Sequence, residues 1–293
     1  MNPLPLDTPL LVRLLLSCLI AAAITAGIMI ARAEWKWLKS RGALTSGARR
    51  NMGLSLSALP PNVLVTVLMT PVWHALYAKA ATYAITDLPL SVLSIPLALL
   101  AADFSYYWEH RCAHRVAPLW ALYHAYHHTA DSYTVAVAYR VSFLNQFLAP
   151  AFYMPWILLG IDPLLMIAMQ LFVFHYQAWI HTELIGRLKG FDAWFNSPLN
   201  HRMHHSRADE HKLANLGAVT LLWDRLFGTY VQPELPVVYG IGSEPAPKTI
   251  LGLYTQPWRS FIESARLGRA RRRAAAATAQ GARNGQTAAP GRP

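Results

Sequence analysis

Residues 110–128 of the chain read HRCAHRVAPLWALYHAYHH and contain five histidines in two groups. The first group, at 110–114, has the spacing HxxxH, and the second, at 124–128, has the spacing HxxHH. The HxxHH spacing returns once more at 201–205. Side chains three or four residues apart share one face of a helix, so each group presents its imidazoles in one direction.

These three histidine boxes predict a metal centre, because neutral imidazole is the commonest protein ligand for transition metals. Eight imidazoles exceed what one metal ion uses, so the pattern predicts two ions. Histidines at helix ends that face lipid headgroups or form core hydrogen bonds are the alternative, and they do not explain the repeated spacing. The predicted ligands of the three boxes are His110, His114, His124, His127, His128, His201, His204 and His205.

The composition is that of a membrane protein, since hydrophobic residues make up 54% of the chain and charged residues only 14%. The net charge of +11 is concentrated in the loop at 34–53 and in the C-terminal tail. Such an uneven distribution of positive charge predicts a face on the cytoplasmic side of a membrane. It does not predict a nucleic-acid site, because the tail lacks interleaved aromatic residues. The two cysteines, Cys18 and Cys112, do not form a disulfide framework.

Apolar stretches at 9–31, 54–78, 88–108 and 142–181 predict about four to five transmembrane helices. The last stretch is long enough for two spans. A signal peptide is the alternative for the first stretch, but no basic cluster precedes it and it is too long. By the positive-inside rule the loop at 34–53 is cytoplasmic, and all three boxes then fall on that side.

The predicted fold class is therefore an all-α integral membrane protein with a cytoplasmic helical cap that holds the metals. Its membrane is predicted to be the inner or plasma membrane. The tail is rich in Ala, Arg and Gly and is predicted to be disordered. The predicted segments are an N-terminal helix and basic loop (1–53), a catalytic domain (54–235), a C-terminal segment (236–263) and the tail (264–293).

The donor set favours iron and dioxygen chemistry. The zinc hydrolase motif HExxH is absent, and so is the Glu-x-x-His of soluble di-iron bundles. Iron suits an all-imidazole cluster with open positions, although ligand type alone leaves zinc and manganese as alternatives. Dioxygen activation at a membrane predicts oxidation of a lipid C–H bond. The chain has no GxGxxG and no cysteine set for an iron–sulfur cluster, so an external electron donor is predicted.

The boxes and their order also resemble those of the fatty acid hydroxylase/sterol desaturase superfamily of integral-membrane di-iron oxidases. The resemblance covers about 90–232, and the stretch 103–108 is similar to the superfamily's entry to the first box. The stretches 179–186 and 223–229 are similar to its bacterial branch and to alkylglycerol monooxygenases. It implies two iron ions, dioxygen as co-substrate, a lipid substrate and an electron donor of reductase, cytochrome or ferredoxin type. Hydroxylation and desaturation both remain open.

The resemblance adds His181 as a ninth ligand, with Gln177 one helical turn before it. One departure stands out: relatives often have Asp-x-Asn-Tyr-Gly after the last box, whereas residues 213–217 read LANLG. If the missing Asp orients a histidine in relatives, then Asp209, Glu210 or Asp224 replaces it here. The residues expected around the ligands are Gln177, Glu183, Asn215 and Asp224.

The remaining histidines, His74, His175 and His211, are predicted to be structural or solvent-exposed. Two other function classes compete with a lipid oxidase. A zinc-dependent membrane hydrolase would work without oxygen. A non-catalytic metal-binding or transport protein would carry its ligands in the middle of the membrane, and the boxes lie outside the apolar stretches.

Overall fold

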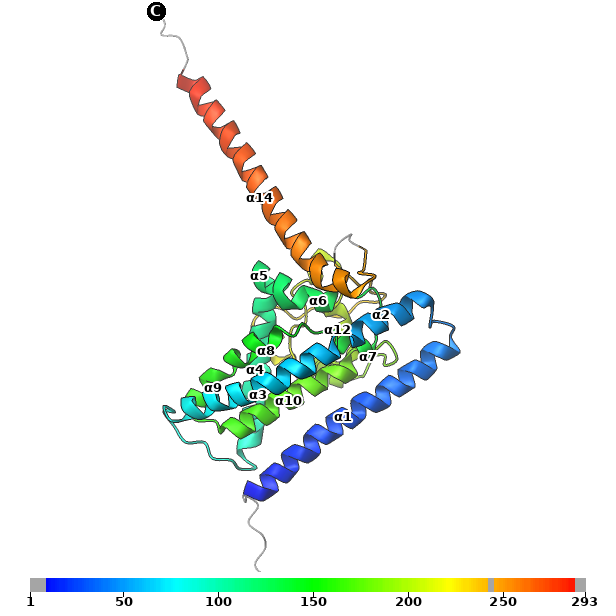
Figure 1. Ribbon diagram of the computed structural model, residues 1–293, viewed down its shortest axis with the longest axis vertical. Coiled ribbons are helices and arrows are strands. Elements are labelled where there is room, and N and C mark those ends of the chain that lie inside the picture. The colour runs from blue at the N-terminus through cyan, green and yellow to red at the C-terminus, as the bar shows by residue number, and fades with distance from the viewer. Residues whose placement is uncertain (1–8, 242–244, 288–293) are drawn as a thin grey trace, which may run out of the picture.

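The computed structural model describes residues 9–241 and 245–287, and this part of the chain is all-helical, with isolated β-bridges but no strand (Figure 1). The predicted all-α fold class is confirmed. The elements are α1 (Pro9–Ser40), α2 (Ser46–Leu56), α3 (Leu59–Ala81), α4 (Ser94–Arg115), α5 (Ala117–Leu119), the π-helix η1 (Trp120–His124), α6 (Ala125–His128), α7 (Val135–Ala138), α8 (Asn145–Leu148), the 3-10 helix η2 (Ala149–Phe152), α9 (Met154–Leu158), α10 (Pro163–Ile180), α11 (Phe191–Trp194), α12 (Pro198–His204), the 3-10 helix η3 (Asp209–His211), α13 (Leu222–Leu226) and α14 (Ile250–Thr287).

Helix α10 is the centre of the body and packs chiefly against α1 and α4. Its first turn is capped by Asp162, whose carboxylate accepts a hydrogen bond from the backbone N–H of Leu165 at 3.0 Å. Leu165, Met169 and Val173 are fully buried in the apolar core shared with α1 and α4. This packing fixes the far end of α10, where His181 follows the helix.

Three helical segments are long and apolar enough to cross a membrane, at 10–40, 46–81 and 163–180. On α1 and α3 many large apolar side chains are exposed, Met29 and Val67 among them. Exposed apolar faces of this size suit lipid contact and not water. The chain is therefore a helical membrane protein, while the predicted number of four to five spans is not confirmed.

The stretch at 142–181 differs from the prediction of two full spans. Only α10 has spanning length, and the residues before it form the short helices α8, η2 and α9. Pro150 and Pro155 interrupt them, because proline cannot donate the backbone hydrogen bond of a continuing helix. Gly160, at φ 108°, then makes the turn into α10.

Helix α4 also differs from the predicted span at 88–108. It runs on to Arg115, so the first histidine box lies inside the helix, and it carries the buried acids Asp103 and Glu109.

The tail predicted to be disordered from 264 onward continues as part of α14 up to Thr287, and residues 288–293 lie outside the described residues. Ala, Arg and Gln have high helix propensity, which explains a helix in this composition. Figure 1 shows α14 projecting away from the body. Its first turns pack against the body, where Leu253 is fully buried and Tyr254 lies against Tyr126 with ring centroids 4.8 Å apart.

Arg140 joins α2 to the segment that follows the second histidine box. Its fully buried guanidinium donates hydrogen bonds to Ser55 Oγ at 3.1 Å, Thr129 Oγ1 at 3.1 Å and the backbone oxygen of Asn51 at 3.0 Å. Thr129 directly follows His128, so this network holds the end of α6 against α2.

Arg140→Ala is expected to destabilise the protein by about 2–4 kcal/mol, since the buried acceptors lose their donors. Thermal unfolding in detergent measures this effect. Arg187→Ala, which removes an exposed arginine, is the matched control and should change stability by less than about 0.5 kcal/mol. Equal unfolding temperatures for the two variants would contradict the assigned role of Arg140.

Candidate metal centre

Helices α4, η1, α6 and α12 and the end of α10 bring nine histidines together in two groups. In each group the potential ligand atoms all lie within 4.8 Å of one another. All nine histidines predicted as ligands belong to these groups. We call them cluster A (His110, His114, His124, His128 and His204) and cluster B (His127, His181, His201 and His205).

The two HxxHH boxes are each divided between the clusters. In the second box His124 and His128 join cluster A, while His127 points to cluster B. In the third box the pair four residues apart, at 201 and 205, joins cluster B and His204 joins cluster A. Each HxxHH box therefore supplies both clusters, whereas the HxxxH box supplies cluster A alone, and the rings of His128 and His205 stack at 4.4 Å between the two clusters.

A π-helical turn carries part of the second box. In η1 the backbone N–H of Ala125 bonds the carbonyl of Trp120, five residues earlier. Such turns are rare and occur frequently at functional sites. The turn places His124 with its Nε2 2.9 Å from Nε2 of His110 on α4.

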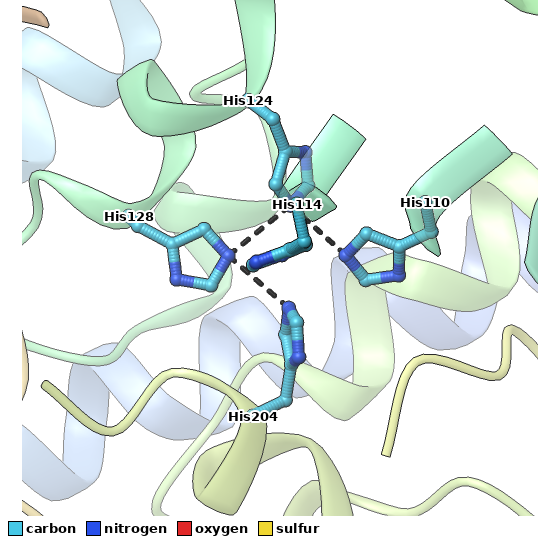
Figure 2. Close-up of side chains that lie close together, drawn as sticks. All are labelled: His110, His114, His124, His128 and His204. Atoms are coloured by element: carbon cyan, nitrogen blue, oxygen red, sulfur yellow. Dashed lines mark hydrogen bonds between the residues drawn. The ribbon is translucent and has the colours of Figure 1, made fainter. Parts of the chain in front are cut away.

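The geometry of cluster A fits a metal ion (Figure 2). Nε2 of His128 lies 3.1 Å from Nε2 of both His124 and His204. Metal–nitrogen bonds of about 2.1 Å at right angles place neighbouring nitrogens about 3 Å apart. Cluster B has the same spacing, because Nε2 of His181 lies 3.1 Å from that of His127 and 3.2 Å from that of His205.

Backbone carbonyls orient three of the rings. Nδ1 of His110 donates to the carbonyl of Leu216 at 2.8 Å, and Nδ1 of His204 donates to that of Ala214 at 2.8 Å. Nδ1 of His181 donates to the carbonyl of Gln177 at 2.6 Å. A carbonyl only accepts, so each Nε2 keeps its lone pair and faces other imidazoles. Metal-binding histidines characteristically have this outer hydrogen bond.

Burial keeps the clusters uncharged. It lowers the pKa of both His110 and His181 to about 4, although their carbonyl hydrogen bonds act in the opposite direction. Burial and the neighbouring imidazoles lower the pKa of His205 well below its usual value. All three are neutral at physiological pH, which is the form that binds metal.

Asp224 fixes the loop that carries the Leu216 carbonyl. Its carboxylate accepts hydrogen bonds from the backbone N–H groups of Leu216 at 2.7 Å and Gly217 at 2.8 Å, and from Thr229 Oγ1 at 2.7 Å. Burial raises the pKa of Asp224 to about 6, so the group is largely ionised at neutral pH. Of the three acids predicted to orient a ligand, Asp224 is the one placed to do so, and it acts through a carbonyl.

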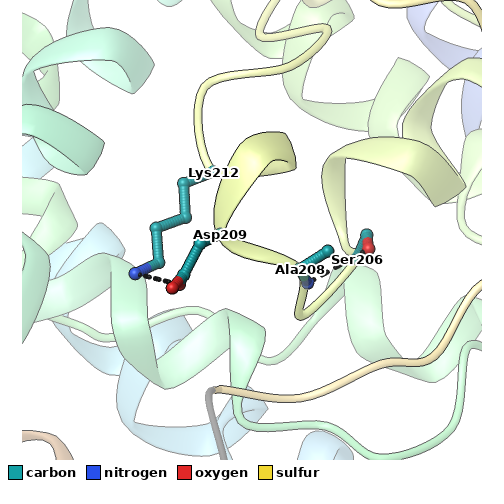
Figure 3. Close-up of polar contacts among 4 residues, drawn as sticks. All are labelled: Ser206, Ala208, Asp209 and Lys212. Carbon is teal, nitrogen blue, oxygen red and sulfur yellow. Dashed lines mark hydrogen bonds and ion pairs between the residues drawn. The ribbon is translucent and has the colours of Figure 1, made fainter.

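The other two acids lie away from the clusters. Asp209 is exposed and forms an ion pair with Lys212 at 2.6 Å, while Ser206 Oγ accepts a hydrogen bond from the backbone N–H of Ala208 (Figure 3). Glu210 is also exposed.

The remaining residues expected around the ligands have different roles. Asn215 exchanges two hydrogen bonds of 2.9 Å with the backbone of Val231 and so supports the same loop as Asp224. Glu183 is exposed and accepts a hydrogen bond from Tyr239 at 2.6 Å. Gln177 donates to the carbonyl of Ala218 at 3.3 Å, and its own side-chain oxygen is buried with no hydrogen bond to any described residue.

The three histidines predicted to be structural lie outside both clusters. His74 is exposed on α3, Nδ1 of His175 bonds the carbonyl of Leu171 on its own helix, and Nδ1 of His211 bonds Ser206 Oγ.

Two buried acids that support the site were not singled out from the sequence. Asp103 on α4 accepts hydrogen bonds from the backbone N–H of Val219 at 2.8 Å and the indole of Trp223 at 3.1 Å. Glu34 on α1 accepts from the hydroxyl of Thr182, next to His181, and from the backbone N–H of Val135. An acid within or beside an apolar segment was the available signal, because such residues are costly to bury without a partner.

Comparison of the sequence with known proteins finds a matching family and several relatives. A sequence model described as Fatty acid hydroxylase matches residues 95–229. Alkylglycerol monooxygenase of Xenopus tropicalis is 39% identical over 145 residues, which cover 50% of this chain and 32% of that protein. The human alkylglycerol monooxygenase is 39% identical over 144 residues, covering 49% and 32% of the two chains. Ornithine lipid hydroxylase OlsE of Rhizobium tropici is 31% identical over 173 residues, covering 56% and 50%.

The matched region contains every histidine of the two clusters. Residues 95–229 thus resemble the fatty acid hydroxylase/sterol desaturase superfamily, and the resemblance noted from the boxes is confirmed. The match spans about a third of the alkylglycerol monooxygenases and half of OlsE. No solved structure gives a significant match to this chain.

Proposed function

We propose that this chain is a membrane-bound, oxygen-dependent lipid hydroxylase with two iron ions. The observation that carries the proposal is the pair of buried, all-imidazole clusters, one with five and one with four potential ligands. Five imidazoles exceed the four-coordinate sites that zinc prefers. The names of the relatives, monooxygenase and lipid hydroxylase, support the same chemistry.

In this proposal clusters A and B each hold one iron, and the irons when bound supply the activation of dioxygen. The carbonyls of Leu216, Ala214 and Gln177 keep the ligating lone pairs directed inward. Burial of the clusters excludes bulk water from the reaction. One oxygen atom enters a lipid C–H bond and the other leaves as water, with an electron pair from an external donor and two protons.

We further propose that the clusters face the cytoplasm. The basic residues at 34–53 lie in the last turns of α1, in the loop after it and in α2, and α2 lies beside the clusters through the network of Arg140. Positive residues accumulate on the cytoplasmic side of membrane proteins. Clusters on that side are also accessible to a soluble electron donor. A zinc-dependent hydrolase and a non-catalytic metal protein are the alternatives that the test below addresses.

Lipid mass spectrometry of a host that expresses the chain under ¹⁸O₂ tests the proposal. The intact protein should yield a lipid that gains one ¹⁸O atom, and His127→Ala should yield none. His211→Ala, a histidine outside both clusters, is the matched control and should behave as the intact protein. A protein-dependent lipid product that forms without oxygen would contradict the proposal and favour a hydrolase.

A further inference from the structure

Helix α14 is anchored close to the point where α3 begins. Leu253, in its first turn, is fully buried in a small core with Leu54 on α2 and Ala58, the residue directly before α3. About one turn into α3, Val63 and Leu64 are exposed and start the apolar surface that suits lipid contact. The first turns of α14 also contact η1 and α6, which carry the second histidine box, so α14 lies on the side of the membrane that carries the clusters.

The direction of α14 differs from that of the helices with spanning length. Helices α1 and α3 each pack along α10, whereas α14 runs crosswise to all three and extends away from the body (Figure 1). A helix with this direction lies along the membrane surface when the other three cross the bilayer. Its anchor beside the start of α3 gives it the matching depth.

The exposed part of α14 has an apolar stripe. Leu251, Trp258 and Ile262 are 71%, 37% and 46% exposed. Spacings of seven and four residues place these three side chains on one face of the helix. The buried Leu253 is two residues from Leu251 and therefore points to the opposite face, toward the body. The body leaves the stripe uncovered.

Positive charge lies beside this stripe. Arg259 and Arg266 are exposed and seven residues apart, so they share a face next to the stripe. Residues 266–273 read RLGRARRR and contain five arginines, while Glu263 is the only acidic residue in the sequence from 250 to 287. Tryptophan and aliphatic residues on one face with arginines beside them are typical of helices that lie in a membrane interface.

We propose that α14 binds the anionic surface of the same bilayer that the spanning helices cross. The stripe of Leu251, Trp258 and Ile262 enters the headgroup region, and the arginines pair with lipid phosphates. A nucleic acid would also pair with the arginines, but it would leave the aliphatic side chains of the stripe in water. This proposal does not depend on the metals or on the proposed function.

Backbone amide exchange of residues 258–269 in the metal-loaded full chain tests the proposal. A helix that projects into water opens readily, and binding to a surface slows its exchange. The exchange should be at least about 10-fold slower in nanodiscs with about 30% phosphatidylglycerol than in nanodiscs of phosphatidylcholine alone, since each arginine at an anionic surface contributes about a factor of five. High salt should remove much of the difference, because it screens the charges.

Arg259→Gln/Arg266→Gln should lose most of the slowing in the anionic nanodiscs, and Arg259→Lys/Arg266→Lys, which keeps the charge, should retain it. Arg187→Gln/Lys189→Gln removes the same charge from an exposed loop and is the matched control that should exchange as the intact protein does.

Equal exchange of the intact protein in the two kinds of nanodisc would overturn the proposal, and so would equal exchange of the 259/266 glutamine variant and its control in anionic nanodiscs. Slowing that appears only after an oligonucleotide is added would assign the arginines to a nucleic acid and would also overturn it. Loss of the lipid-dependent slowing in Trp258→Gln would support insertion of the stripe.

Discussion

Replacing His204 by alanine and replacing its neighbour His205 by alanine are expected to empty different metal sites. His204 belongs to cluster A and His205 to cluster B, although the two residues are adjacent in the chain. Each variant should therefore lose one of two bound ions and keep the other. Lipid oxidation should fall by more than about 100-fold in both, which exceeds the loss from removing an outer hydrogen-bond partner.

Metal analysis of the purified variants, together with their spectra, measures this difference. His211→Ala is the control, because His211 lies outside both clusters and bonds Ser206 Oγ. The interleaved arrangement would be refuted if both variants lost the same ion, or if either kept both ions.

The second large effect is expected for Asp224→Ala. The substitution leaves the backbone N–H groups of Leu216 and Gly217 and the hydroxyl of Thr229 buried without their acceptor. Stability should fall by about 3 kcal/mol or more. The Leu216 carbonyl also loses its fixed position against His110, so cluster A should bind its metal about 10- to 100-fold more weakly.

Chelator-induced metal release and thermal unfolding measure the two effects. Asp224→Asn keeps one acceptor oxygen and should show a smaller loss. Asp209→Ala removes an exposed aspartate whose partner is Lys212 and serves as the matched control. Release from cluster A at the same rate in Asp224→Ala and Asp209→Ala would show that Asp224 does not position His110.

The histidines that form the candidate metal centre could be predicted from the sequence, because side chains three and four residues apart share one face of a single helix. All nine predicted histidines lie in the clusters. Their division could not be predicted, since it depends on how α4, α6, α10 and α12 approach one another. His127 and His128 follow each other in the chain and join different clusters for this reason.

The groups that orient the ligands were harder to predict than the ligands. The expectation of a carboxylate beside a histidine followed from relatives that carry an Asp in the stretch corresponding to 213–217. Instead, Leu216 and Ala214 present backbone carbonyls, which the sequence alone does not reveal. Asp224 acts one step further out, on the N–H groups of the loop.

The apolar stretches predicted the helical membrane fold but overestimated the regular spans. At 142–158 hydrophobicity suggested a full helix, whereas Pro150 and Pro155 divide the segment into short ones. Long-range partners were also invisible in the sequence. In the sequence Arg140 and Glu34 look like isolated charges. In the folded chain Arg140 donates to the backbone oxygen of Asn51, and Glu34 accepts from the backbone N–H of Val135.

The most direct test of the two-metal account is the metal content of the intact protein, purified without chelators from iron-replete, aerated cells. Elemental mass spectrometry of the protein should find two iron ions per chain, one for each cluster. A single ion per chain would contradict the division of the boxes into two sites. Two zinc ions per chain would leave the sites in place and contradict the oxygen chemistry proposed for them.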